Sequence, residues 1–127
     1  MNEFQKLLDL VEKLRAPNGC PWDRKQTIES LAKCVKEEAD EVLEAIEKKD
    51  YENLKEEIGD LILTVSMITQ IAKEEQKFDM EEVLNSVCKK MIERHTWVFG
   101  EDKAETAEEA LEMWKRNKKI IKSSNKF

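Results

Sequence analysis

Residues 31–46 read LAKCVKEEADEVLEAI, and this stretch decides the fold. Its apolar side chains recur at the spacing of one helical face: Leu31, Cys34, Val35, Val42, Ala45 and Ile46. At about 100° per residue, Glu38 projects into the middle of this apolar stripe and Glu41 lies at its border. Burying an unpaired carboxylate costs several kcal/mol, so this helix needs a cation next to the two acids.

The next helical stretch repeats the pattern, with Glu57 inside an apolar stripe and Asp60 one turn further along. If the two helices meet antiparallel around a turn near Lys49, Glu38 should face Asp60. In the same way, Glu41 should face Glu57. Each helix then presents two carboxylates on one face. Ligation by oxygen alone suits hard ions such as Mg²⁺ or Mn²⁺, so the sequence predicts a divalent-metal site between these helices.

The composition favours one helical domain over residues 1–127. Charged residues make up 39% of the chain and apolar residues 40%, with only three Gly and two Pro among 127 residues. This mixture is typical of long helices with exposed charged faces, and no convincing strand pattern is present. The net charge of −6 argues against a nucleic-acid partner, which would favour a basic surface.

Periodicity and capping signals predict the individual elements of an all-α bundle. The first three helices should span about residues 3–15, 27–49 and 50–76, with Asp50 as a helix N-cap. A fourth helix should open at Asp79, and a capping box at Thr106 should begin the last one. Residues 16–23 and 95–103 are expected to be loops. The bundle should therefore be built on an antiparallel helix hairpin.

The third predicted helix is apolar around more than half of its circumference. A small domain cannot easily cover such a surface alone, so we expect a homodimer or higher homo-oligomer that completes the bundle.

The cysteines and the apolar runs suggest a cytoplasmic protein without a membrane partner. Cys20, Cys34 and Cys88 are odd in number and lie far apart, which favours reduced thiols. The first ten residues carry acids and lack the apolar core of a signal peptide. The most apolar run, residues 61–72, is too short to span a bilayer.

An ordered series of motifs resembles the MazG family of nucleotide pyrophosphohydrolases. The central motif is EEADE at 37–41 followed by EIGD at 57–60, which is similar to the EExxE…ExxD pattern of that family. The resemblance covers nearly the whole chain. The other matching blocks, in family order, are CPWD at 20–23, QT at 26–27, EEIGDL at 56–61, FD at 78–79, Lys90 with Arg94-His95, VFG at 98–100, and Trp114 with Lys118.

This resemblance implies an enzyme that hydrolyses nucleoside triphosphates between the α and β phosphates, releasing pyrophosphate. The family motif assigns metal ligation to Glu38, Glu41, Glu57 and Asp60, with Mg²⁺ as cofactor and Mn²⁺ as a possible substitute. The candidate catalytic residues are Glu38 and Glu37, the latter to hold or deprotonate the attacking water. Family members are also oligomers, often dimers.

Four further residues are candidates for substrate binding. Lys90, Arg94 and Lys118 occupy basic positions of the family pattern and would contact the pyrophosphate portion; without the resemblance they are equally compatible with surface ion pairs. Trp22 is compatible with stacking on a base or with a place in the core. Buried Trp is the commoner of these two situations.

Three departures from the family pattern leave the substrate open. Ile28 stands where a His is common, Glu93 where a basic residue is common, and Thr96 where a Pro is usual. A relative with narrower specificity is therefore an alternative, acting on dUTP, dCTP or phosphoribosyl-ATP. A non-catalytic helical module that binds metal or a protein partner is the alternative from a different class.

Overall fold

The computed structural model describes the backbone of residues 2–124 and the side chains of residues 2–121. Within this range every regular element is a helix, which confirms the prediction of an all-α fold. None of the described helices is both long and apolar enough to cross a membrane. The chain forms two compact units, and the division between them falls at Met80, where α5 begins.

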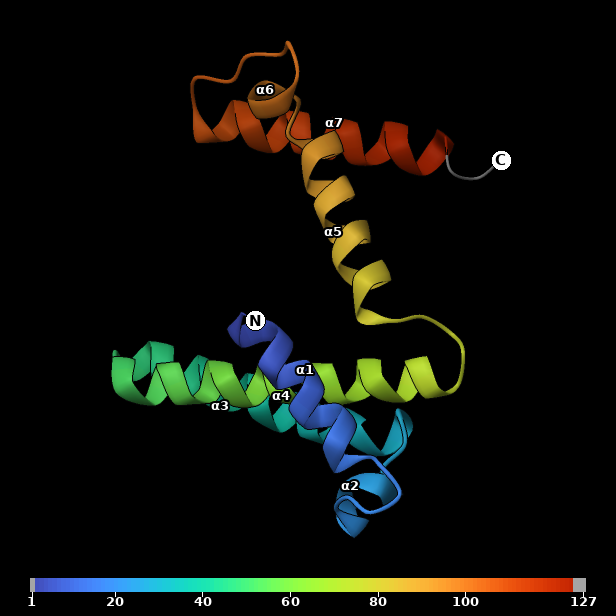
Figure 1. Ribbon diagram of the computed structural model, residues 1–127. Helices are drawn as coiled ribbons and strands as arrows, with labels where there is room; N and C mark the ends of the chain where they lie inside the picture. The colour runs from blue at the N-terminus through green and yellow to red at the C-terminus, as the bar shows by residue number, and fades with distance from the viewer. Residues whose placement is uncertain (1, 125–127) are drawn as a thin grey trace. The chain divides into compact units, whose positions relative to one another are not determined.

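The first unit contains four α-helices and one turn of 3₁₀-helix. Figure 1 shows α3 running alongside α4 in the opposite direction, while α1 lies across α4. The elements are α1 (Glu3–Leu14), α2 (Pro21–Lys25), η1 (Glu29–Leu31), α3 (Ala32–Lys48) and α4 (Tyr51–Glu74).

The turn between α3 and α4 is fixed by two residues. Lys49 ends α3 in the left-handed conformation with φ 54°, and its N–H donates to the carbonyls of Ala45 and Ile46. Asp50 begins α4 as its N-cap and accepts a hydrogen bond from the Asn53 N–H at 3.2 Å, as the sequence predicted. This short connection brings the N-terminal half of α4 next to the C-terminal half of α3.

The apolar core lies away from the predicted acidic residues. Its buried members come from α1, η1 and the C-terminal half of α4; they are Val11, Leu31, Met67 and Ile71. Glu57 and Asp60 lie in the N-terminal half of α4 and therefore outside this cluster. The core thus fixes one end of α4 and leaves the other end to pack with α3.

Two sequence-based boundaries in this unit are wrong. The helix predicted to start at residue 27 begins instead at Ala32 and is preceded by the separate turn η1. The predicted loop 16–23 contains the start of α2, because Pro21 is tolerated in the first turn of a helix, where its missing N–H is not needed.

The second unit contains α5 (Met80–Arg94), α6 (Thr96–Phe99) and α7 (Ala107–Ser124), of which α6 packs on α7. The predicted cap of the last helix is present, because the Thr106 hydroxyl accepts from the Glu109 N–H at 3.1 Å. Helix α6 is a correction to the prediction of a loop over 95–103. It is a single turn, too short to show helical periodicity in the sequence.

Candidate functional site

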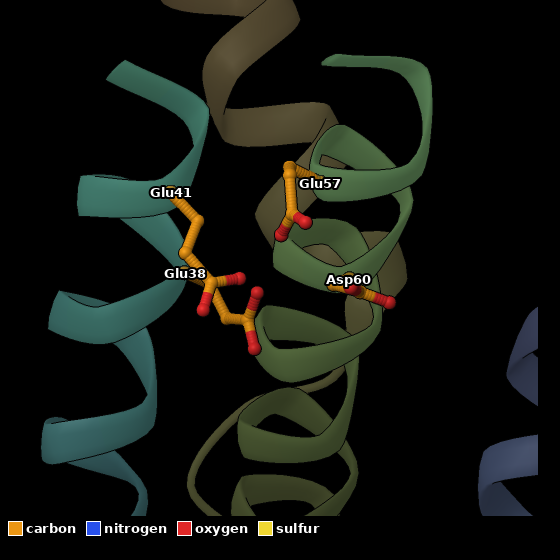
Figure 2. Close-up of side chains that lie close together, drawn as sticks. All are labelled: Glu38, Glu41, Glu57 and Asp60. Carbon is orange, nitrogen blue, oxygen red and sulfur yellow. The ribbon is translucent and has the colours of Figure 1, made fainter. Parts of the chain in front are cut away.

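Four carboxylates gather between α3 and α4. Each of the four offers a carboxylate oxygen, and these oxygens all lie within 4.8 Å of one another. In Figure 2, Glu38 and Glu41 extend from α3 toward α4, and Glu57 extends from α4 toward them. We call this group the acidic cluster; it consists of Glu38, Glu41, Glu57 and Asp60.

Two oxygens in the acidic cluster are buried without a partner. The Oε2 atoms of Glu38 and Glu57 are shielded from solvent and accept no hydrogen bond from any described residue. None of the ion pairs among the described residues includes a member of the cluster. Buried carboxylate oxygens are normally hydrogen-bonded or bound to a cation, so this arrangement needs an explanation.

Hydrogen bonding within the cluster, burial and neighbouring negative charge raise the pKa of two of these acids. A side-chain hydrogen bond with Glu41, together with burial and the charges of Glu41 and Asp60, raises the pKa of Glu57 to about 7. Burial is the largest cause of the raised pKa of Glu38, followed by the charges of Glu41 and Asp60. Both shifts have the direction that burial and neighbouring negative charge produce in a carboxylic acid.

The residues of the acidic cluster fit a divalent cation. Two rigid helices supply the oxygens, and two of these oxygens have no other partner. Hard ions such as Mg²⁺ and Mn²⁺ prefer this all-oxygen donor set. The structure therefore brings together the four residues that the sequence marked as metal ligands.

Glu37 lies outside the acidic cluster. Its carboxylate is exposed and lies 3.7 Å from the ammonium group of Lys33, one turn earlier on α3. The structure therefore places this candidate catalytic residue next to Glu38 in sequence but among solvent-facing side chains.

A buried cation occupies the second unit. The side chain of Arg94 is 8% exposed, and its guanidinium carbon lies 5.2 Å from the centre of the Trp114 ring. The ring of His95 contacts both Trp97 and Trp114, at centroid distances of 4.9 and 5.0 Å. The Nε atom of Arg94 is buried and has no hydrogen-bond partner among the described residues. We call these four residues the arginine–tryptophan cluster.

The other two basic candidates are exposed residues on the helices that carry this cluster. Lys90 lies one turn before Arg94 on α5, and Lys118 lies one turn after Trp114 on α7. Residues four apart share a helix face, so each lysine is a neighbour of the arginine–tryptophan cluster. Sequence reasoning named the three basic residues but gave Trp114 no role of its own, although it is the ring on which Arg94 rests.

Trp22 is not brought to the acidic cluster of its own chain. The indole is 58% exposed, so a place in the core is wrong. Arg15 binds the carbonyls of Asp23 and Gln26 and pairs with Glu74 at 2.8 Å, which holds α2 at the C-terminal end of α4. By the rise of an α-helix, that end is about 20 Å along the axis from Asp60.

The fold and the acidic cluster define an all-α protein with a candidate carboxylate metal centre between two neighbouring helices. Residues 26–99 match the model of the MazG nucleotide pyrophosphohydrolase domain, which is more than half of the chain. The chain therefore belongs to the MazG family.

Named relatives and a solved structure agree with this assignment. The chain is 40% identical over 119 residues to a nucleoside triphosphate pyrophosphohydrolase of Escherichia coli K12, covering 93% of this chain and 45% of that protein. It is 47% identical over 98 residues to the nucleoside triphosphate pyrophosphohydrolase/pyrophosphatase MazG of Thermotoga maritima, covering 77% of this chain and 38% of that protein. The crystal structure of a mazG-related protein from Thermotoga maritima superimposes with a TM-score of 0.75 at 38% identity, covering 91% of this chain and 98% of that one. The chain thus spans less than half of the length of the two named enzymes.

Proposed function

We propose that this chain hydrolyses nucleoside triphosphates between the α and β phosphates, releasing a nucleoside monophosphate and pyrophosphate. The acidic cluster carries the proposal, because it presents converging oxygens of which two are buried without a hydrogen-bond partner among the described residues. A triphosphate binds an acidic protein together with divalent ions that offset its own charge. The activities named for the E. coli and T. maritima relatives support the same chemistry.

The four carboxylates of the acidic cluster are the proposed ligands of Mg²⁺, for which Mn²⁺ would substitute. When bound, the ion would offset the carboxylate charges, polarise phosphate oxygens and lower the pKa of a water molecule. Glu38 is central to this role, because it comes from the apolar stripe of α3 and one of its oxygens has no other partner.

Glu37 is the proposed group that holds or deprotonates the attacking water. Its present partner, Lys33, forms a long and exposed ion pair with it. Exposed pairs of this kind contribute little free energy, so the Glu37 carboxylate can leave Lys33 at small cost. Its position directly before Glu38 keeps it next to the acidic cluster in sequence.

Lys90, Arg94 and Lys118 are the proposed partners of the phosphates. A guanidinium offers a planar set of N–H donors that matches phosphate oxygens, and Arg94 has a buried donor that no described group accepts. The two lysines add exposed positive charge on the adjoining turns of α5 and α7.

Trp22 is the proposed stacking surface for a nucleotide base. Its exposed indole, held by the contacts of Arg15 with α2 and Glu74, is an aromatic face available to a flat ligand. Its distance from Asp60 means that a base stacked on it would not belong to a triphosphate held by the acidic cluster of the same chain.

We further propose that the chain is a single MazG-like domain, built on the α3–α4 hairpin, that pairs with a second copy. The matched segment 26–99 extends over parts of both compact units. On α4, Ile58, Ile62 and Val65 form an apolar row that is between 38% and 43% exposed. A second copy would cover this row, and sedimentation analysis would then give twice the mass of the chain. A Val65→Asp variant that stays at the same mass as wild type would count against α4 as the contact surface.

The thiols support a cytoplasmic location. Cys20, Cys34 and Cys88 are all free in the structure. Free thiols persist in reducing compartments, whereas oxidising compartments favour disulfides.

A nucleotide panel tests the proposed reaction. The purified chain is incubated with each ribo- and deoxyribonucleoside triphosphate and Mg²⁺, and pyrophosphate and orthophosphate are assayed in parallel. Pyrophosphate released in equal amount with monophosphate supports the proposal. Release of orthophosphate alone overturns it. Activity on only one or two nucleotides identifies an enzyme of narrower substrate specificity. No turnover of any nucleotide, with Mg²⁺ bound, identifies a non-catalytic metal-binding module.

A further inference from the structure

A closed ring of hydrogen bonds joins α6, the loop after it and α7. The Asn117 amide nitrogen donates to the Thr96 hydroxyl at 2.9 Å, and this hydroxyl donates to Asp102 at 2.7 Å. Arg116 pairs with the same carboxylate and donates to the Asn117 side-chain oxygen at 3.2 Å. The hydroxyl of Thr96 and the guanidinium of Arg116 hold the pKa of Asp102 below its ordinary value. The ring is thus complete and charge-compensated.

Asn117 is the buried member of the ring, and it also donates a hydrogen bond to a residue outside the ring. Its side chain is among the least exposed polar groups of the unit, at 5%. Besides the bond to Thr96, its amide nitrogen donates to the backbone carbonyl of Arg94 at 3.0 Å. Both donors and the acceptor of this amide are therefore used. A leucine would fill a similar volume but could form none of these three hydrogen bonds, so packing alone does not account for this residue.

The carbonyl that Asn117 binds belongs to Arg94, whose buried Nε has no acceptor among the described residues. Arg94 is the last residue of α5, where carbonyls lack partners within the helix. Its side chain rests on Trp114 and has a buried Nε without an acceptor. Lys118, the next residue after Asn117, is one helical turn after the same tryptophan on α7. The side chain of Asn117 is thereby hydrogen-bonded to the backbone of Arg94, and Asn117 directly precedes Lys118 in the sequence. Arg94 and Lys118 are both proposed phosphate ligands.

We propose that Asn117 is a positioning residue that orients Arg94 and Lys118 toward the phosphate groups of the substrate. The inference rests on the proposed function, in which these two cations bind phosphate. It concerns a feature of this chain in particular, because the ring needs the hydroxyl of Thr96, and a proline at that position has none. Asn117 itself does not touch the substrate.

Binding of inorganic pyrophosphate, measured by calorimetry with Mg²⁺ present, tests this inference. Asn117→Leu removes both donated bonds without changing charge. We expect its pyrophosphate affinity to fall about tenfold, since small displacements of aligned groups have effects of at least this size. In hydrolysis, the KM for nucleotide should rise by a similar factor while kcat changes little, because Arg94 and Lys118 bind substrate and transition state alike. A merely structural role would not produce this split.

The matched control is Asn85→Leu, which makes the same replacement at an exposed position of α5 and should bind pyrophosphate as wild type does. Asn117→Leu binding pyrophosphate with wild-type affinity overturns the inference, as does a wild type that does not bind pyrophosphate. If Asn117→Leu does not fold, Thr96→Val decides: weaker binding at an unchanged melting temperature supports the inference, and unchanged binding overturns it. A wild type that binds pyrophosphate but hydrolyses nothing refutes the proposed function and leaves the comparison of variants intact.

Discussion

The acidic cluster of the first unit and the arginine–tryptophan cluster of the second unit both contain buried polar atoms without hydrogen-bond partners. These atoms are acceptors in the first cluster and a donor in the second. In the first, the buried Oε2 atoms of Glu38 and Glu57 have no donor. In the second, the buried Nε of Arg94 has no acceptor. Buried polar atoms without partners are rare, because each costs free energy that a change to an apolar residue would remove. Each cluster by itself therefore marks a candidate site for a ligand of the opposite charge.

The two clusters differ in whether neighbouring residues repel or attract the charged groups. In the acidic cluster, a side-chain hydrogen bond with Glu41, burial and the neighbouring negative charges together raise the pKa of Glu57. Arg94 instead lies over an aromatic ring that attracts cations, and its backbone is bound by Asn117. The stability of the first unit should therefore depend on a bound ion, whereas the second unit should keep its structure without a ligand.

The largest expected effect is on catalysis when the acidic cluster loses one charge. Glu38→Gln keeps the size of the side chain but removes a proposed metal ligand. We expect kcat/KM for pyrophosphate release to fall by about 10³-fold, which corresponds to the several kcal/mol that a bound metal contributes. Without metal, the variant should be at least as stable as wild type, because a buried charge is removed.

Glu47→Gln is the matched control for this variant. Glu47 lies on the same helix but is exposed and outside the acidic cluster, so its activity should equal that of wild type. Normal turnover by Glu38→Gln would show that the acidic cluster is not the reaction centre, and the comparison between the two clusters would lose its basis.

A smaller effect is expected when the second cluster loses its charge. Arg94→Met keeps an unbranched side chain over Trp114 but removes the guanidinium. We expect the KM for nucleotide to rise by about thirtyfold or more, which corresponds to the lower end of the cost of losing one charged partner from a buried pair, about 2 kcal/mol. The melting temperature should change little, since the removed guanidinium forms no ion pair among the described residues and loses only its contact with the Trp114 ring. Lys103→Met, at an exposed position, is the control; equal KM values for both variants would exclude Arg94 from phosphate binding.

The sequence predicted the acidic cluster better than the cation site, for a physical reason. Glu38 and Glu57 interrupt apolar stripes, and helical periodicity with one short turn is enough to bring them together. The burial of Arg94 and the contacts of Asn117 depend on how α5, α6 and α7 pack, which no local period encodes. Trp22 illustrates the same limit, because the contacts of Arg15 with distant residues decide where α2 lies.

Mg²⁺ should stabilise the first unit through the acidic cluster. An ion that binds only the folded state adds about 2.7 kcal/mol at a hundred times its Kd, which corresponds to a rise of several degrees in melting temperature. Glu57→Gln should show much less of this rise. The measurement is a thermal melt at increasing Mg²⁺ concentration, with NaCl added to match ionic strength. A flat response of the wild type would mean that the acidic cluster does not bind the ion in the free protein.

The smallest effect is a dependence of stability on pH, which tests whether Glu57 titrates with a raised pKa inside the acidic cluster. The pKa of Glu57 is about 7 in the folded chain and about 4.5 for an ordinary glutamate, so the folded state binds this proton more tightly. The associated stability is complete below pH 4.5 and is lost as the pH rises toward 7. Without metal, Glu57→Gln should therefore melt near wild type at pH 5 and above it at pH 8.

The control for this series is Glu56→Gln, an exposed neighbour on α4, which should follow wild type at both pH values. Saturating Mg²⁺ should reverse the advantage of Glu57→Gln at pH 8, because the ionised carboxylate is then the favoured form. A constant difference between Glu57→Gln and wild type from pH 5 to pH 8 would mean that Glu57 does not titrate in this range. The carboxylates would then not be electrostatically coupled, and the acidic cluster would need no ion to offset its charge.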